Sequence, residues 1–455
     1  MMRTRDLRSL FPLLILLTLG GMGPAAARDA GDLRFPERPA LADYLAWADA
    51  HSPRLAGQAA RAESMRAQAE RAGALPGLKL AWGEMIVPVE TRVGPQQRVF
   101  SLSQSLPWFG TLGARRASVA AEAAAADENV RETRWQVAHD IRRAWYELAW
   151  LDEQAAIVAR DLDLSRQTEV VARTRYEAGE GPYAQVLEAQ MEIGRLEARL
   201  AGLRDRRTPV GARLNAAAGL APGAPVPVAA DLPRDLATAP LPGRADLDEA
   251  LRLGNPTLAS LRNLQESRRA GVDAADRKAW PELTVGVDYI MTGEAAMPGV
   301  ADSGKDPVIA RLGVNIPLWG GQAGAEKKAS AGQLRAVSAG LSDTRLRLAA
   351  DLENTLYAWR EAGRDLELYG TTLLPRSAQN LAVTAAAYES GQIGFTRLLD
   401  ARQAHLGLEL SLLRARYDRV LAVNDLGALL GVTPEDLVAG RLPGAAVPAA
   451  EREGS

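Results

Sequence analysis

The chain has 455 residues, a formal net charge of −2 and no cysteine. Such a balanced charge gives no reason to expect nucleic acid as a partner. The lack of cysteine excludes disulfides, thiolate metal sites and cysteine nucleophiles, and the three histidines lie far apart in the sequence. The sequence contains no nucleophile elbow, phosphate-binding loop or metal-ligand spacing, so we expect neither an enzyme nor a bound cofactor.

Residues 1–27 have the pattern of an export signal. Three arginines precede an apolar run at Leu10–Leu19, and Ala25–Ala27 provide a small-residue cleavage site. The apolar run is too short for a membrane-spanning helix. We therefore expect an exported protein whose mature chain starts near Arg28, and any bilayer that it enters must be crossed by strands.

The mature sequence repeats itself after about 210 residues. Tyr176–Gly179 (YEAG) recurs as Tyr388–Gly391 (YESG), and Pro107–Gly110 (PWFG) recurs as Pro317–Gly320 (PLWG). The offset drifts from 317 − 107 = 210 to 388 − 176 = 212, which we interpret as small loop insertions. The expected organisation is repeat 1 at 28–220, a Pro/Ala-rich linker at 221–244, repeat 2 at 245–440 and a flexible tail at 441–455.

Each repeat contains two runs in which polar and apolar residues alternate. The predicted strands cover about 77–87 and 97–106 in repeat 1, and about 282–291 and 308–316 in repeat 2. About ten residues is the length that a tilted strand needs to cross a bilayer, although a half-buried soluble sheet has the same alternation. If the strands form a membrane barrel, the candidates for its lumen are the polar residues Glu282, Thr284, Asp288, Arg311 and Asn315.

Long helical hairpins follow the strands, at about 111–218 and 321–431. Residues 115–175 contain neither Pro nor Gly, which predicts continuous helix on the order of 90 Å long. A heptad stripe runs through Ile141, Leu148 and Leu162. Adding 211 gives Leu352, Trp359 and Leu373, so we expect both copies to bury the same face. Helices of this length imply antiparallel packing with narrow seams.

The number of strands predicts an oligomer. Two strands in each of two copies give 2 × 2 = 4 strands, too few to close a barrel, and an open sheet edge is not tolerated in lipid. Barrels of the outer membrane begin at about 8 strands. Three chains would supply 3 × 4 = 12 strands, which is wide enough for an aqueous channel.

In both copies the sequence resembles the TolC-like outer-membrane efflux protein family. The motifs are "SPRL" and "NPTL", "LPWFGTLGARR" and "IPLWGG", "RYEAGEGPYAQVLEAQ" and "AYESGQIGFTRLLDAR", and "LNAAAGL" and "LGALLGV". The resemblance implies a mixed α and β fold: a homotrimer with a 12-stranded barrel in the outer membrane of a Gram-negative bacterium, continuous with a long periplasmic α-helical barrel. It implies two partners, a periplasmic adaptor (membrane fusion) protein and an inner-membrane efflux pump of the RND type. The "PWFG" form is most similar to members that accompany heavy-metal or cation efflux pumps.

The resemblance also implies site residues at the helical turns. The expected adaptor contacts are the turn glycines and their aromatic neighbours: Tyr176, Gly179, Tyr183, Tyr388, Gly391 and Phe395. The family places an Asp six residues after the turn glycine, where this sequence has Gln185 and Arg397. Three residues further, Glu188 and Asp400 keep a carboxylate in both copies. The hypothesis is a pore gate of Glu188 and Asp400 that Arg397 modulates.

Other interpretations remain open. Turn chemistry alone would account for the residues around the two glycines, and a solvated helix face would account for Glu188 and Asp400. A soluble periplasmic coiled-coil scaffold or adaptor protein would explain the export signal and the long helices. It would not explain four alternating runs placed between helices. The sequence does not identify the exported substrate, because the pump selects it.

Overall fold

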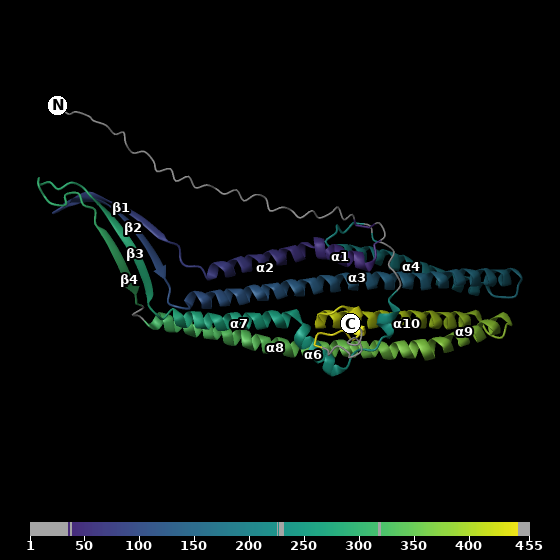
Figure 1. Cartoon of the computed structure of the whole chain (residues 1–455). Helices are drawn as coiled ribbons and strands as arrows, with labels where there is room; N and C mark the ends of the chain where they lie inside the picture. The colour runs from purple at the N-terminus through teal and green to yellow at the C-terminus, as the bar shows by residue number, and fades with distance from the viewer. Residues whose placement is uncertain (1–34, 37–38, 225, 227–231, 317–319, 445–455) are drawn as a thin grey trace, which may run out of the picture. The chain divides into compact units, whose positions relative to one another are not determined.

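The computed structural model describes residues 35–36, 39–224, 226, 232–316 and 320–444 (Figure 1). The chain divides into two units, Met1–Glu37 and Arg38–Ser455, and all the described helices and strands lie in the second. The expected export signal and residues 445–455 of the expected tail lie outside the described residues. Helices predominate and a small antiparallel sheet is present, which confirms the mixed α and β composition.

The elements occur in the following order along the chain. The first half contains α1 (Leu41–His51), α2 (Pro53–Ala72), β1 (Lys79–Thr91), β2 (Gly94–Leu106), α3 (Thr111–Glu177) and α4 (Tyr183–Ala218). The second half contains α5 (Arg234–Thr238), α6 (Arg244–Gly254), α7 (Pro256–Arg277), β3 (Glu282–Thr292), β4 (Val308–Asn315), α8 (Gly320–Glu367), η1 (Leu368–Leu373), α9 (Leu374–Glu389), α10 (Phe395–Leu430) and α11 (Pro434–Val438). The short helix α5 lies within the segment expected to be only a linker.

The four strands form one antiparallel sheet in the order β1-β2-β3-β4. They occupy the runs whose alternation predicts strands. The two hairpins are joined by pairing of β2 with β3, in which Ser101 lies opposite Asp288 and Leu102 opposite Val287. In the described part of the chain β1 and β4 each have one paired neighbour, so the sheet has two open edges.

The helices form a layer of four columns in the same order as the strands (Figure 1). The first column is α2 with α4, the second is α3, the third is α7 with α10, and the fourth is α8, η1 and α9. The main packing contacts join neighbouring columns. The column of α2 and α4 therefore lies at one edge, continuing from β1, and the column of α8 and α9 lies at the other, continuing from β4.

The second and fourth columns differ in regularity. Helix α3 runs through 67 residues without a break, because it contains neither Pro nor an internal helix-breaking turn. The fourth column changes to a π-helix at Leu368–Leu373, which ends two residues before Pro375. A proline has no N–H for the carbonyl four residues earlier and its ring crowds that turn, which accounts for the wide π-turn at this point.

The heptad stripe is buried unequally in the two halves. Ile141, Leu148 and Leu162 are buried, whereas Leu352 is buried and Trp359 and Leu373 are only partly buried. The expectation that both halves bury this face alike is therefore wrong for the single chain. The reason is position, because α3 packs against helices on both sides and α8 with α9 lies at an edge.

Candidate functional site

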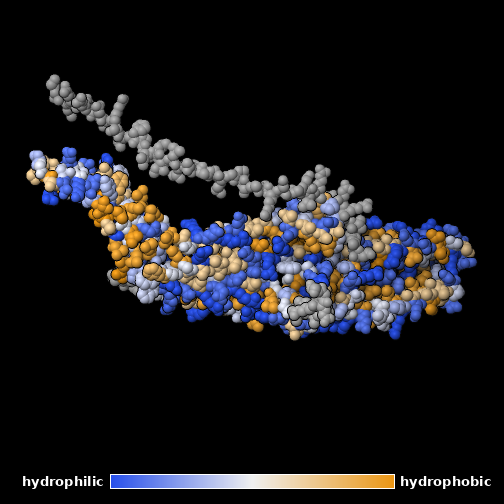
Figure 2. Space-filling model, viewed as in Figure 1, coloured by the Kyte–Doolittle hydropathy of each residue, from blue (hydrophilic) through white to orange (hydrophobic). Residues whose placement is uncertain are grey.

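The sheet has one apolar and one polar face. Because paired residues of an antiparallel sheet share a face, the register places Leu80, Leu102, Val287 and Ala310 on the same side. Large apolar side chains on this side are exposed to an unusual degree: Leu80 is 76% exposed and Leu312 is 73% exposed. Figure 2 shows this as a hydrophobic zone over the strands, between hydrophilic loops and the helices. An exposed apolar surface of this kind marks contact with lipid or protein.

The five expected lumen residues lie together on the opposite face. Glu282 is paired with Asn315 and Thr284 with Gly313, and Asp288 lies four residues beyond Thr284 on the same face of β3. Arg311 forms an ion pair with the buried Asp288, and Ser105 on β2 donates a hydrogen bond to Glu282 at 2.6 Å. The register thus gathers polar side chains from β2, β3 and β4, which suits a face in contact with water.

The described helices include no candidate membrane span. None of them combines the length and the apolar content that a membrane span requires.

The two helical turns have the same backbone geometry. Gly179 and Gly391 have φ angles of 75° and 76°, in the left-handed region that favours glycine. At the first turn the Glu180 amide donates to the Arg175 carbonyl, and at the second the Gln392 amide donates to the Ala387 carbonyl. This is the Schellman arrangement that ends a helix, so each glycine is required by its turn.

The aromatic pairs beside the two turns differ in exposure. Tyr176 and Tyr183 contact each other with ring centroids 5.1 Å apart, and both are about half exposed. Tyr388 and Phe395 make the corresponding contact at 5.7 Å, but they are only 4% and 3% exposed. The second pair packs against Ala189 of α4. Only Tyr176 and Tyr183 are therefore free to contact another protein in the single chain.

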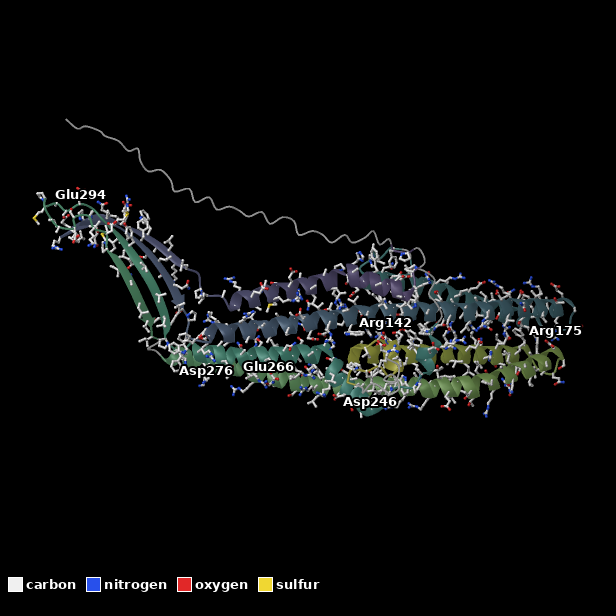
Figure 3. The ribbon with its side chains drawn as sticks, in the orientation of Figure 1. Arg142, Arg175, Asp246, Glu266, Asp276 and Glu294 are labelled. Atoms are coloured by element: carbon white, nitrogen blue, oxygen red, sulfur yellow. The ribbon has the colours of Figure 1, made fainter. Side chains whose placement is uncertain are left out.

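Arg175 connects the two turns, and the sequence gives no signal for it. Its guanidinium donates to the carbonyls of Tyr388 at 3.2 Å and Glu389 at 2.8 Å, and lies 4.8 Å from the centroid of the Tyr388 ring. A cation at the C-terminus of α9 satisfies carbonyls that the helix leaves unpaired. Figure 3 labels Arg175 at this end of the helices. The residue 212 positions later is Ala387, so the repeat gives no hint of the contact.

The expected gate residues lie beside this connection. The Gln185 side-chain oxygen accepts a hydrogen bond from the Tyr388 hydroxyl at 3.1 Å, and Glu188 accepts one from the Thr396 hydroxyl at 3.2 Å. Arg397 and Asp400 are exposed, and within the described chain they form no ion pair with each other. Gln185 and Glu188 thus connect the two hairpins, whereas Arg397 and Asp400 extend into solvent.

His139, near the middle of α3, connects this helix to the C-terminal part of α10. Its Nε2 lies 2.6 Å from Asp425, and its Nδ1 lies 3.5 Å from Asp140. Hydrogen bonding to Asp140 and then to Asp425 raises the pKa of His139 to about 9. The imidazole is therefore protonated at neutral pH and serves as a cation between two carboxylates. Within the described ranges, His, Asp and Glu side chains nowhere gather in a group that could hold a metal ion.

Two segments of the chain match a protein-family model described as "Outer membrane efflux protein", at residues 46–220 and 247–432. The chain belongs to the outer membrane efflux protein family. This confirms the resemblance that the repeated motifs suggest. The family consists of channels rather than enzymes. No sequence among curated proteins matches the chain.

Solved structures of outer-membrane efflux proteins share the fold. The outer membrane protein VceC from Vibrio cholerae superposes with a TM-score of 0.72 at 18% identity, covering 86% of this chain and 96% of that one. CusC gives a TM-score of 0.74 at 14% identity, with 88% and 93% covered. The MtrE outer membrane channel of Neisseria gonorrhoeae gives 0.71 at 18% identity, with 87% and 89% covered. At these identities the likeness establishes the fold.

Proposed function

We propose that this protein is the outer-membrane channel of a tripartite efflux system. Three copies would join their sheets into one barrel of 3 × 4 = 12 strands, continuous with an α-helical barrel in the periplasm. The barrel would be a passive conduit to the exterior for small molecules or metal ions. An inner-membrane pump and a periplasmic adaptor would deliver this cargo.

The observation that carries the proposal is a two-faced sheet with two open edges. Its apolar face is exposed, its polar face gathers Glu282, Asp288 and Arg311, and β1 and β4 each lack a second neighbour among the described strands. Unpaired backbone groups are not tolerated in lipid, so edge β1 of one copy would pair with edge β4 of the next. The columns of helices have the same two edges, so one rotation would close both layers.

The two edge columns carry exposed apolar side chains that a neighbouring copy would bury. On α4 these are Leu187 and Met191, and on the opposite edge they include Leu346 and Tyr357 of α8. The two stripes are different surfaces, as a head-to-tail ring requires. A soluble scaffold with the same helices would have no use for the exposed apolar face of the sheet.

We also propose that the helical turns are the periplasmic end of the channel. Tyr176 and Tyr183 are exposed and would meet the adaptor. Glu188 and Asp400 from three copies would bring 2 × 3 = 6 carboxylates around one axis, next to Arg397, and such a ring attracts cations. Single-channel recording tests the gate. The Glu188→Ala and Asp400→Ala double variant should lose cation preference, and parental conductance and selectivity would place the gate elsewhere.

Fractionation of cells tests the main proposal. The mature protein should be found in detergent-extracted outer membrane as an oligomer that heating in detergent dissociates. A water-soluble product in the periplasm that never partitions with lipid would favour the scaffold instead.

A further inference from the structure

Aromatic side chains gather where the sheet meets the helices. Trp108, which follows β2, stacks on Trp280, which precedes β3, with ring centroids 5.2 Å apart and planes 12° apart. Phe109 contacts Trp108 and is 77% exposed, and Trp280 is 56% exposed. Indole rings with one apolar and one polar side favour the boundary between lipid tails and water.

The backbone holds this aromatic group in place. Arg277 at the end of α7 donates a hydrogen bond to the Phe109 carbonyl at 3.1 Å, and the Thr111 amide donates to the Trp108 carbonyl at 3.0 Å. Gly110 has a φ angle of 79°, and a Cβ atom there would lie 2.4 Å from the Arg277 guanidinium. Exposed rings are thus presented by a rigid junction rather than by a loose loop.

Cations without ion-pair partners surround the same junction. Within the described chain, Arg71, Lys79, Arg115, Arg116 and Lys328 form no ion pair, and all except the partly buried Arg115 are exposed. They come from the end of α2, the start of β1, the first turns of α3 and the N-terminal part of α8. Neighbouring lysines are neutralised, since Lys278 pairs with Glu326 and Lys327 pairs with Asp276. Within the described chain, the carboxylates of the adjoining stretches that form no ion pair are Glu70, Asp273 and Glu282, which are fewer than these cations, so the junction has an excess of positive charge.

The opposite end of the sheet has the reverse charge. The far end of the β1–β2 hairpin and the β3–β4 loop contain the acidic residues Glu90, Glu294, Asp302 and Asp306 against the cations Arg92 and Lys305. Figure 3 labels Glu294 at this far end of the strands and Asp276 at the helical end. The sheet therefore has an apolar middle, an acidic end and a cationic end with exposed tryptophans.

From these observations we infer that the junction binds anionic phospholipid headgroups. The inference rests on the proposed membrane location. Apolar side chains of the sheet would contact the acyl chains, Trp280 and Phe109 would lie at their boundary with water, and Arg115, Arg116 and Lys328 would meet the phosphates of the adjoining leaflet. The phosphate diester and glycerol of phosphatidylglycerol leave a net negative charge, whereas the choline of phosphatidylcholine cancels it. Charge complementarity therefore selects the former.

The test compares the two lipids on the detergent-purified oligomer. The junction variant is Arg115→Gln, Arg116→Gln and Lys328→Gln together. The matched control is Arg204→Gln, Arg345→Gln and Arg376→Gln, three exposed cations without ion-pair partners in the described chain that lie on α4, α8 and α9. Retention of each lipid is measured by native mass spectrometry.

The parent and the control should retain phosphatidylglycerol in preference to phosphatidylcholine, and the junction variant should lose that preference by about tenfold or more. Equal retention of the two lipids by the parent, or equal behaviour of junction and control variants, would overturn the inference. A second measurement needs no variant: raising salt from roughly 0.1 to 1 M should weaken retention of phosphatidylglycerol by the parent and leave phosphatidylcholine unchanged. A membrane oligomer without lipid preference refutes only this inference, whereas absence of the protein from the membrane refutes the proposed channel.

Discussion

The two helical turns contain the same aromatic-glycine-aromatic pattern and differ in what covers it. Tyr388 and Phe395 are buried against α4, and Arg175 and Gln185 bond to Tyr388. Tyr176 and Tyr183 make the same mutual contact but remain half exposed. Because the backbone at Gly179 and Gly391 is alike, the difference comes from position within the layer. The first hairpin covers the aromatic pair of the second through Arg175, Gln185 and Ala189, whereas the aromatic pair of the first hairpin is left half exposed in the single chain.

The largest effect is expected from removing a buried ring. Phe395→Ala should destabilise the second turn by about 3–5 kcal/mol, since it deletes a fully buried aromatic, whereas Tyr183→Ala should cost the first turn less than about 1 kcal/mol. Amide hydrogen exchange around Gly391 and Gly179 measures both. Equal opening of the two turns in the two variants would show that their difference in burial has no energetic consequence.

A smaller effect on stability is expected from pH, which changes the charge of His139 at the contact between α3 and α10. The pKa of His139 is about 9 in the folded protein, against an ordinary value of 6.5. Its contribution to the free energy of unfolding is therefore fully present below pH 6.5 and is lost as the pH rises through 9. The shift corresponds to at most about 3 kcal/mol. Unfolding followed at several pH values should show this loss in the parent and not in His139→Gln. The same pH dependence in both proteins would assign it to other groups.

Arg175→Ala should give the smallest effect of the three. The side chain is partly solvated, so loss of its two bonds to carbonyls should cost about 1–2 kcal/mol. Hydrogen exchange should accelerate at Glu389–Gln392, and Arg173→Ala, which removes a cation that bonds within α3, serves as the control. If the control accelerates exchange there as much, Arg175 does not hold the turns together.

Much of this fold can be predicted from local signals. Alternation predicts the four strands, and the absence of Pro and Gly over 115–175 predicts the long helix α3. Left-handed turns at Gly179 and Gly391 follow from the repeated "Y-E-x-G" pattern, because only glycine adopts them without strain. Each of these features depends on residues close together in the chain.

Features that depend on distant residues are not predictable in this way. The contact of Arg175 with Tyr388 spans 213 residues, and nothing near Arg175 indicates it. The same sequence pattern surrounds Tyr176 and Tyr388, so it does not indicate that one is exposed and the other buried. That difference depends on contacts with residues distant in the sequence. The drift in repeat offset is interpreted from sequence as loop insertions. The π-turn at Leu368–Leu373 holds one more residue than an α-helical turn, so one residue of this drift suits an insertion within the helix.

A disulfide across the sheet edges of two copies would test whether the sheets join into one barrel. The chain has no cysteine, so any disulfide that forms must involve the introduced cysteines. Leu80→Cys on β1 is combined in turn with Ala310→Cys, Leu312→Cys or Val314→Cys on β4, all on the apolar face. Within one copy, β1 and β4 are three strand spacings apart, about 14 Å, too far for a disulfide.

We predict that oxidation in isolated outer membranes links one of these combinations into covalent dimers and trimers. Leu80→Cys with Ile309→Cys, which lies on the polar face, should link far less. Only monomers from every apolar-face combination, in protein that is present in the membrane, would contradict closure of the sheet between copies.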